Sequence, residues 1–307
     1  MAITLITDHE FAAAYIADGR VKVEGFDVEP TWPAEGGGSL YAGAFTGLGL
    51  DIISLPLTNF LIAKGQRRPI VGLPVFPDVF FPHVGAQINK SSGISSVKDL
   101  EGKRVGVRGW GFSPGTWLRG ALADVYDLDL TKVNWVEAEP NSLMAADYPR
   151  PSKFNITKGG EQAAELESGA LDAVFYDRAG PEPTDNVMHL FSDPLGEALK
   201  YNKQTGIFPV NIVLVAKGET LEANPGLAQA VVDASDKARD LYYQNVSDGD
   251  EHMTLPVKWL RDTRLFPHLN GLENNRVALE AIIRYSHDLG LISRQIDPAE
   301  LFFEGAK

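Results

Sequence analysis

The sequence predicts an α/β protein with two lobes, each built from a sheet and flanking helices. Short apolar segments alternate with amphipathic segments, which is the strand–loop–helix rhythm of α/β folds with mainly parallel strands. The 307 residues also correspond to about two domains of roughly 150 residues each. Two extended apolar segments, 84–88 and 210–215, can each cross between lobes. We therefore expect lobe 1 to comprise 1–84 and 210–307, lobe 2 to comprise 85–209, and a ligand cleft to lie between them.

The predicted strands are short runs rich in Val, Ile and Leu that end at glycine or at polar residues. They span residues 3–7, 51–55, 104–107, 134–136 and 171–176. Helical patterns are expected at 60–64, 116–126 and 161–168, and the last of these stops before Gly169. Each strand that leads into a helix brings its carboxyl end to a loop in which a ligand can bind.

The last third of the chain is predicted to be mainly helical. In residues 225–245, apolar side chains recur three and four positions apart. They are Leu227, Ala230, Val231, Ala234 and Ala238. A second amphipathic segment, 276–289, ends before Gly290, which is a helix-stop signal. The acidic stretch 247–251 is expected to be a solvated loop.

The charge balance limits the class of ligand. The chain has 28 Lys and Arg against 41 Asp and Glu, which gives a net charge of −13. Phosphates of nucleic acids and anionic membranes are held by clustered Lys and Arg, so neither is an expected partner. A small carboxylate remains possible as a ligand, because a few arginines can override the global charge locally. Whether the protein forms a homo-oligomer is left open.

The absence of cysteine excludes several chemistries. With no Cys, the chain has no disulfide, thiolate zinc site, iron–sulfur cluster or cysteine nucleophile. No apolar run approaches the ~18 residues that a membrane-spanning helix needs. Residues 3–7 predict a core strand rather than the basic and apolar regions of a secretory signal, so we expect a cytoplasmic protein.

A glycine-rich turn at 109–115 lies between a predicted strand and a predicted helix. Backbone N–H groups in such a turn, together with the helix N-terminus, suit a carboxylate or phosphate. Gly111 and Ser113 are therefore candidate binding residues, and the alternative is a tight turn with no ligand. Trp110 and Trp117 are candidates to stack on an aromatic ligand, although core packing is the commoner use of such residues.

Four further polar residues are candidates for substrate binding. Thr58 and Asn59 follow a strand and precede a helix, where either can be the N-cap of the helix or bind a ligand. Arg178 follows the strand at 171–176 and can clamp a carboxylate, or else pair with a neighbouring aspartate. Arg119 is expected in the first turn of a helix, an unfavourable place for a cation, which favours a specific partner.

Two of the six histidines are placed to move protons. His9 lies just past the first strand, and His83 lies beside a predicted crossover. Either is a candidate general acid or base near neutral pH. The other four are expected to be surface or packing residues: His189, His252, His268 and His287. No histidine spacing is typical of a metal site, and no motif indicates a cofactor, so neither is predicted.

Several runs resemble those of the 4,5-dihydroxyphthalate decarboxylases, in order over essentially the whole chain. They are 18–21, 73–77, 80–83, 99–107, 116–120, 205–209, 271–276, 284–286 and 290–291. The resemblance implies a type II periplasmic-binding-protein fold, in which each lobe is a mixed sheet flanked by helices.

The resemblance also implies a cofactor-free decarboxylase acting on an aromatic or related unsaturated carboxylic acid. Arg178 and the turn at 109–115 would hold a carboxylate, and His83 or His9 would protonate the ring carbon that loses carbon dioxide. Two alternatives remain open. One is a non-catalytic binding protein for a small anionic or aromatic solute, and the other is an enzyme of another reaction type, such as an isomerase or hydratase.

Some polar positions of the family pattern differ in this chain. Pro82 and Ile212 stand where the family usually has Arg and His, which disfavours a doubly charged phthalate as the ligand. Asn211, beside Ile212, remains as a candidate substrate-binding residue. The family residues that are retained are Asn59, His83, Trp117, Arg119 and Arg178.

Overall fold

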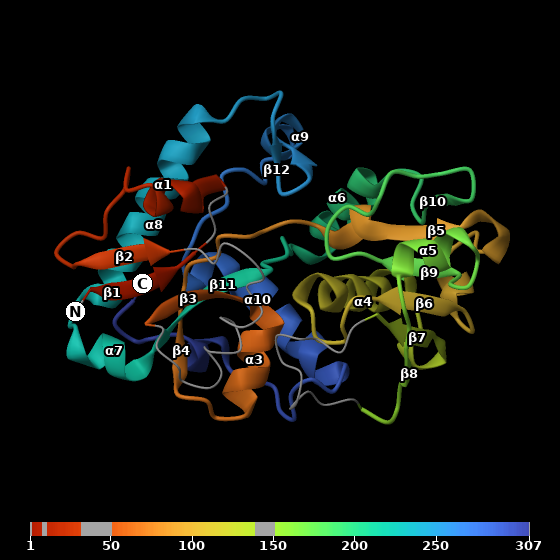
Figure 1. The fold of residues 1–307 in the computed structure, drawn as a ribbon, viewed down its shortest axis with the longest axis horizontal. Helices are drawn as coiled ribbons and strands as arrows, with labels where there is room; N and C mark the ends of the chain where they lie inside the picture. The colour runs from red at the N-terminus through yellow and green to blue at the C-terminus, as the bar shows by residue number, and fades with distance from the viewer. Residues whose placement is uncertain (1, 8–10, 32–50, 139–150, 307) are drawn as a thin grey trace. The chain divides into compact units, whose positions relative to one another are not determined.

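The computed structural model describes residues 2–7, 11–31, 51–138 and 151–306. The chain forms two compact units, each assembled from separate stretches of sequence (Figure 1). Unit 1 comprises Met1–Phe80, Val210–Glu280 and Ile296–Lys307, and unit 2 comprises Phe81–Pro209 and Ala281–Gln295. Residues 281–295, which the sequence analysis assigned to lobe 1, therefore pack with unit 2.

The core of unit 1 is a five-stranded sheet with the order β2-β1-β3-β11-β4. Its strands are β1 (Ile3–Ile6), β2 (Val28–Thr31), β3 (Ile52–Pro56), β4 (Ile70–Leu73) and β11 (Ile212–Lys217). β1 pairs in parallel with β2 and β3, whereas β11 is antiparallel to β3 and β4. All five residues of β3 are buried, as expected for a central strand covered on both faces.

Several helices of unit 1 contact this sheet. The described helices of unit 1 are α1 (Ala14–Ala17), α3 (Leu57–Gly65), α7 (Gly218–Ala223), α8 (Leu227–Asn245), α9 (Val257–Asp262) and the first part of α10 (Leu272–Asp288). α8 packs against α1, as Figure 1 shows, and α3 contacts β3, β4 and β11. The predicted apolar positions of α8 face the core, with Leu227, Val231 and Ala238 almost fully buried.

Unit 2 contains a six-stranded sheet with the order β10-β5-β9-β6-β7-β8. Its strands are β5 (Ala86–Asn89), β6 (Arg104–Val107), β7 (Asn134–Glu137), β8 (Asn155–Lys158), β9 (Ala173–Phe175) and β10 (Val187–His189). β9, β6, β7 and β8 run parallel, and β5 is antiparallel to both of its neighbours. Both sheets are therefore mixed, so the expectation of mainly parallel pairing from the strand–helix rhythm was too simple.

Unit 2 has three helices of its own among the described residues. They are α4 (Ser113–Tyr126), α5 (Gln162–Glu167) and α6 (Pro194–Thr205), and the end of α10 joins them. α4 begins at Ser113, three residues earlier than predicted, because Pro114 suits the first turn of a helix. Arg119 is consequently the seventh residue of α4, so the expectation that it lies in the first turn is wrong.

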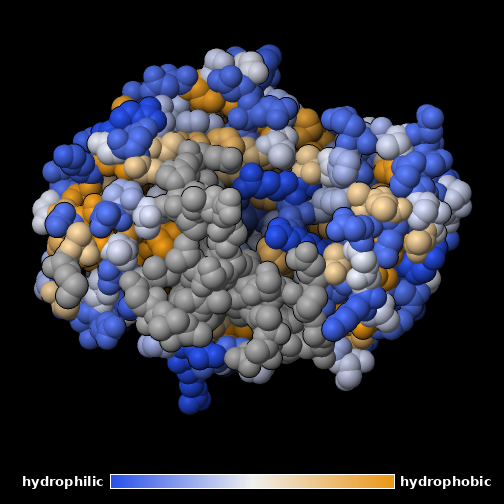
Figure 2. All heavy atoms as spheres, in the orientation of Figure 1, coloured by the Kyte–Doolittle hydropathy of each residue, from blue (hydrophilic) through white to orange (hydrophobic). Residues whose placement is uncertain are grey.

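The polarity of the surface agrees with the amino-acid composition. The face drawn in Figure 2 is largely hydrophilic, with smaller apolar areas between the polar ones. No helix in the described part of the chain is both long and apolar enough to cross a membrane.

Candidate functional site

The carboxyl ends of β6 and β9 bring charged residues together at one edge of the unit 2 sheet. The two strands are parallel neighbours, with Val107 paired to Phe175. Arg108 follows β6 directly, and Asp177 and Arg178 follow β9 two and three residues after Phe175. Because neighbouring strands lie about 4.8 Å apart, these three residues lie close together at this edge. Here we call Arg108, Asp177 and Arg178 the charged edge.

Arg108 and Asp177 form an ion pair at the charged edge. Arg108 Nη1 donates to Asp177 Oδ2 at 3.0 Å, and its guanidinium carbon lies 4.7 Å from the centre of the Phe112 ring. The Arg108 side chain is 56% exposed, whereas that of Asp177 is 19% exposed. Burial raises the pKa of Asp177 above its ordinary value, although Arg108, Arg119 and Arg178 all act to lower it. An exposed guanidinium is thus fixed by a partly buried carboxylate and an aromatic ring.

The sequence predicts Arg178 at this edge but does not single out Arg108. The alternative role of Arg178, an ion pair with Asp177 or Asp185, stays a prediction, and Arg108 donates a hydrogen bond to Asp177. The signal was present, because Arg108 directly follows a predicted strand, as Arg178 nearly does. What the sequence does not show is that β6 and β9, which are 65 residues apart, are adjacent strands.

One backbone N–H group of the glycine-rich turn already donates a hydrogen bond to another part of the chain. The backbone N–H of Trp110 donates to Glu137 Oε1 at 2.9 Å. Glu137 is the last residue of β7 and is 1% exposed. The expectation that this turn offers its N–H groups to a ligand is therefore wrong for Trp110, since a buried carboxylate of the protein takes that hydrogen bond.

Trp110, Trp117 and Arg119 lie in the core of unit 2, each 0% exposed. The Trp110 ring donates to Leu289 O at 3.1 Å, and Arg119 lies over its face, with Cζ 4.0 Å from the ring centre. Trp117 packs edge-on against Tyr285. Arg119 Nη2 also donates to Trp110 O at 2.5 Å. The structure thus favours the packing role for both tryptophans and holds Arg119 beneath the turn.

Gly111 and Ser113 are also buried, at the junction of the turn with α4. Ser113 is the first residue of the helix, and the N-cap position belongs to Phe112, which makes no side-chain capping bond. Their role in binding a substrate remains a prediction.

Thr58 and Asn59 lie inside the first turn of α3 in unit 1. The N-cap is Pro56, so the prediction that either residue caps the helix is wrong. Both are 0% exposed. Asn59 Nδ2 and Oδ1 have no hydrogen-bond partner, which is costly for a buried amide and is a feature of sites that accept a polar ligand or water.

Asn211 joins two segments of unit 1. Its backbone N–H donates to Asp78 O at 2.8 Å, its carbonyl accepts from Leu57 N at 2.8 Å, and its Nδ2 donates to Phe80 O at 3.2 Å. These bonds hold the start of α3 beside residues 78–80. Its expected role in binding a substrate remains a prediction.

His83 lies in a buried aromatic environment in unit 2. It is 0% exposed in a short 3₁₀ helix, Pro82–Gly85, and its ring packs near Phe81, Phe191 and Tyr201. Neither ring nitrogen has a hydrogen-bond partner. Burial lowers its pKa to about 4, against a smaller opposing effect of Glu197, so the imidazole is neutral at pH 7. His9 lies outside the described residues.

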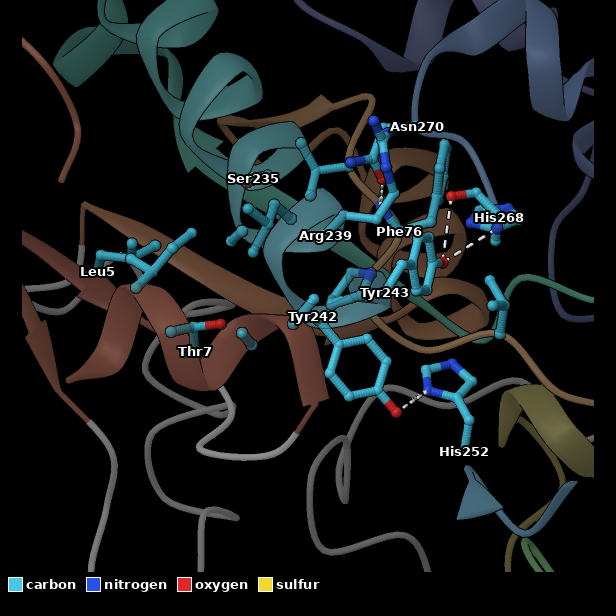
Figure 3. Close-up of a pocket in the computed structure, with 18 residues that line it drawn as sticks. Leu5, Thr7, Phe76, Ser235, Arg239, Tyr242, Tyr243, His252, His268 and Asn270 are labelled. Atoms are coloured by element: carbon cyan, nitrogen blue, oxygen red, sulfur yellow. Dashed lines mark hydrogen bonds between the residues drawn. The ribbon is translucent and has the colours of Figure 1, made fainter. Parts of the chain in front are cut away.

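A separate cavity lies wholly within unit 1 (Figure 3). Two histidines that the sequence analysis assigned to surface or packing roles line it. His252 Nδ1 lies 3.1 Å from Tyr242 Oη, and His268 exchanges hydrogen bonds with Tyr243 Oη through its backbone, as the dashed lines in Figure 3 show. Burial lowers the pKa of His252 to about 4, so this ring is also neutral.

The size and charge of this cavity limit what it can hold. Its volume is about 50 Å³, whereas a benzene ring occupies a cavity of roughly 150 Å³. Arg239, which lines it, is paired with Asp236 and Asp240. The cavity as described therefore accommodates water or a very small molecule rather than an aromatic acid.

No group of three or more His, Asp or Glu side chains suited to a metal ion occurs in the described ranges. In unit 2 the candidate site consists of the charged edge, the turn with Glu137 and the buried His83. Asn59 is a separate buried polar candidate in unit 1.

The two mixed α/β sheets with flanking helices define the periplasmic-binding-protein class of fold. Within this class the chain belongs to the NMT1/THI5-like family, whose model matches residues 57–246. It is 27% identical to a 4,5-dihydroxyphthalate decarboxylase of Comamonas testosteroni over an alignment 308 positions long, which covers 94% of this chain and 92% of the relative. It is also 30% identical to a 4,5-dihydroxyphthalate decarboxylase of Pseudomonas putida, over 60% of this chain and 74% of the relative.

Solved structures support the same fold at low sequence identity. The aliphatic sulphonate binding protein SsuA of Escherichia coli is 13% identical, with a TM-score of 0.55, and the match covers 99% of this chain and 97% of SsuA. A variant of DSZB in complex with biphenyl-2-sulfinic acid is 16% identical, with a TM-score of 0.56, over 98% and 96% of the two chains. Likeness at this level of sequence identity shows the fold and does not fix the chemistry.

Proposed function

We propose that the protein is a carboxy-lyase that removes a carboxyl group from an aromatic or related unsaturated carboxylic acid. The observation that carries this proposal is the similarity to a decarboxylase along 94% of the chain, supported by a second decarboxylase at 30% identity. The proposal includes the expected cytoplasmic location, which cell fractionation tests.

The charged edge is the proposed anchor for the substrate carboxylate. Arg108 keeps guanidinium donors exposed while Asp177 and Phe112 hold its orientation. Arg178 adds a second cation from the next strand. Because Arg108 shares its charge with Asp177, it orients the carboxylate while stabilising that ground state less than an unshared guanidinium would. This favours loss of the carboxylate in the reaction.

In the proposed reaction, a proton is first added to the ring carbon that carries the carboxyl group, while a conjugated hydroxyl of the substrate loses its proton and becomes a carbonyl. The bond between the ring carbon and the carboxyl carbon then breaks and carbon dioxide leaves. The electron pair of that bond restores the aromatic ring and passes onto the conjugated oxygen. His83 and His9 remain the proposed proton donors. A neutral imidazole is a weak acid, so His83 must first take up a proton, for example from a substrate hydroxyl, before it can deliver one.

The direct test is to incubate the purified protein with hydroxylated benzoates and phthalates and to follow carbon dioxide and aromatic product together. Parallel reactions with EDTA establish whether a bound metal is required. We expect stoichiometric release of carbon dioxide from at least one aromatic acid. Compounds that stabilise the protein thermally without any product would instead support the alternative, a solute-binding protein, which the similarity to SsuA favours.

The charged edge offers a matched pair of variants for the same assay. Arg108→Gln should lower kcat/KM by about tenfold or more, because a charge-assisted hydrogen bond to the substrate is lost. Arg104→Gln is the control, since Arg104 pairs with Asp172 at the opposite end of the same strand, β6. Equal effects of the two substitutions would remove Arg108 from the proposed site.

A further inference from the structure

The cavity of unit 1 drawn in Figure 3 is lined by a buried histidine with only one of its ring nitrogens hydrogen-bonded. His252 is 4% exposed, and its Nδ1 lies 3.1 Å from Tyr242 Oη. Its Nε2 has no hydrogen-bond partner in the described part of the chain. A buried polar atom without a partner is unfavourable, because the bond to water that it loses on folding is not replaced. A ligand in the cavity that bonds to Nε2 would supply that bond.

Other polar groups that line the cavity already bind within the chain. Ser235 Oγ donates to a backbone carbonyl of its own helix at 2.8 Å. The Asn270 amide is used at both ends, since its Oδ1 accepts from Phe76 N and its Nδ2 donates to Asp236 Oδ1, each at 2.9 Å. His252 Nε2 therefore differs from these groups, because it still needs a partner.

The charges around the cavity favour a neutral ligand. Arg239, which lines it, is paired with both Asp236 and Asp240. Burial lowers the pKa of His252 and of His268 to about 4, so both rings are neutral at pH 7. An anion would approach a guanidinium that two carboxylates already balance, and a cation would be repelled by that guanidinium.

The size and lining of the cavity favour a small molecule with one polar group. Its volume is about 50 Å³, whereas benzene, with six carbon atoms, occupies a cavity of roughly 150 Å³, so about two or three non-hydrogen atoms fit. A water molecule is held by two to four polar partners. Much of the lining is apolar: Leu5, Ile16, Val75, Val79, Leu214 and Ala238. A short apolar chain with one polar end matches this lining better than water does.

We propose that the unit 1 cavity binds a short-chain alcohol whose hydroxyl group is hydrogen-bonded to His252 Nε2. A hydroxyl group both donates and accepts a hydrogen bond, so it can pair with Nε2 in either tautomer of the neutral ring. The inference does not depend on the proposed carboxy-lyase activity, because the cavity lies wholly in unit 1 and the charged edge lies in unit 2.

NMR titration of the whole protein with ethanol near pH 7 tests the proposal. The reporters are the His252 Nε2 resonance and the methyl resonance of Ala238. The limit on binding free energy per non-hydrogen atom makes a Kd of about 1 to 100 mM the expected range. We expect both resonances to shift saturably within it. No saturable shift up to about 300 mM, several times the weakest expected Kd, would mean that the cavity holds only water and would overturn the proposal.

Ethanethiol provides a matched probe for the hydrogen bond. It has the carbon skeleton of ethanol, its thiol group bonds only weakly, and the chain contains no cysteine with which it could exchange. His252→Leu should weaken ethanol binding relative to ethanethiol about fivefold, as for the loss of one hydrogen bond. The Ala238 methyl group reports both affinities. His287→Leu is the control, because His287 is 40% exposed and lies in unit 2. An unchanged ratio in His252→Leu would overturn the proposal.

The native protein decides the question if His252→Leu fails to fold. At saturation, ethanol should shift the His252 Nε2 resonance more than ethanethiol does, because only the hydroxyl group forms a strong hydrogen bond to it. Equal shifts would overturn the proposal. None of these outcomes changes the proposed function, which is tested by the release of carbon dioxide.

Discussion

At the scale of single residues, burial sets the protonation state of the histidines more than residue type does. Six histidines are indistinguishable in composition, yet His83 and His252 are 0% and 4% exposed, and burial lowers the pKa of each to about 4. Both are neutral at pH 7. A folded-state pKa below the ordinary value of 6.5 means that the unfolded chain binds more protons in acid. These residues therefore make the protein sensitive to acid.

We expect the acid sensitivity to decrease in His83→Phe. The contribution of His83 to stability is complete above pH 6.5 and is lost as the pH falls toward 4. One pH unit below 6.5 the loss is about 1.4 kcal/mol. Urea denaturation near pH 8 and pH 5.5 should therefore show a drop in the free energy of unfolding that is smaller by about this amount in the variant. Phe suits the site because neither ring nitrogen of His83 has a hydrogen-bond partner. Identical drops in the two proteins would refute the assigned pKa shift.

At the scale of elements, α4 shows how one helix contributes to both packing and the candidate site. Its first turn follows the glycine-rich turn, and its interior packs on residues 281–295 of unit 2. Tyr285 donates to Asp124 Oδ2 at 2.6 Å, and Arg284 reaches both oxygens of the same carboxylate at 2.5 and 3.0 Å. Gly120 lies against the Tyr285 ring, so closely that a Cβ atom there would overlap it.

Two glycine substitutions on α4 should have opposite effects. Gly120→Ala should destabilise the protein by about 1–3 kcal/mol, because the added methyl group displaces the Tyr285 ring. Gly115→Ala adds the same group where no described atom lies within 4 Å, so it should be neutral or stabilise by up to about 1 kcal/mol through helix propensity. Thermal and urea denaturation of the two variants measure this difference. A Gly120→Ala variant as stable as Gly115→Ala would mean that α4 and Tyr285 do not pack as described.

At the scale of the whole molecule, each unit is built from more than one stretch of the chain. α10 has its first part in unit 1 and its last part, with the segment that follows, in unit 2. Leu279 is 0% exposed and belongs to unit 1, whereas Leu289 is 1% exposed and belongs to unit 2.

One leucine-to-alanine substitution in each unit should show which elements belong to that unit. Each substitution should lower the free energy of unfolding by about 2–5 kcal/mol. We expect Leu289→Ala to increase amide hydrogen exchange chiefly in α4 and the turn before it, since Trp110 binds the Leu289 carbonyl. Leu279→Ala should increase exchange chiefly in α8 and the sheet of unit 1. The same exchange pattern in both variants would contradict the assignment of residues 281–295 to unit 2.

The sequence by itself determined the class of fold and most of the elements. Hydrophobic periodicity located β1, β3, β6, β7, α8 and α10 because these elements bury apolar side chains at the spacing of a strand or helix. The positions of Arg178 and the glycine-rich turn followed from the same pattern, since polar residues at strand ends are visible in a linear sequence. The absence of cysteine and the negative net charge excluded whole classes of chemistry.

Only the tertiary structure decided which of these residues meet. The adjacency of β6 and β9 pairs Arg108 with Asp177, and that of β6 and β7 brings Glu137 to the Trp110 N–H. Burial turned Trp110, Trp117 and Arg119 into core residues and made His83 neutral. The physical reason is that strand order, desolvation and hydrogen-bond competition depend on contacts between residues distant in sequence, which periodicity along the chain does not record.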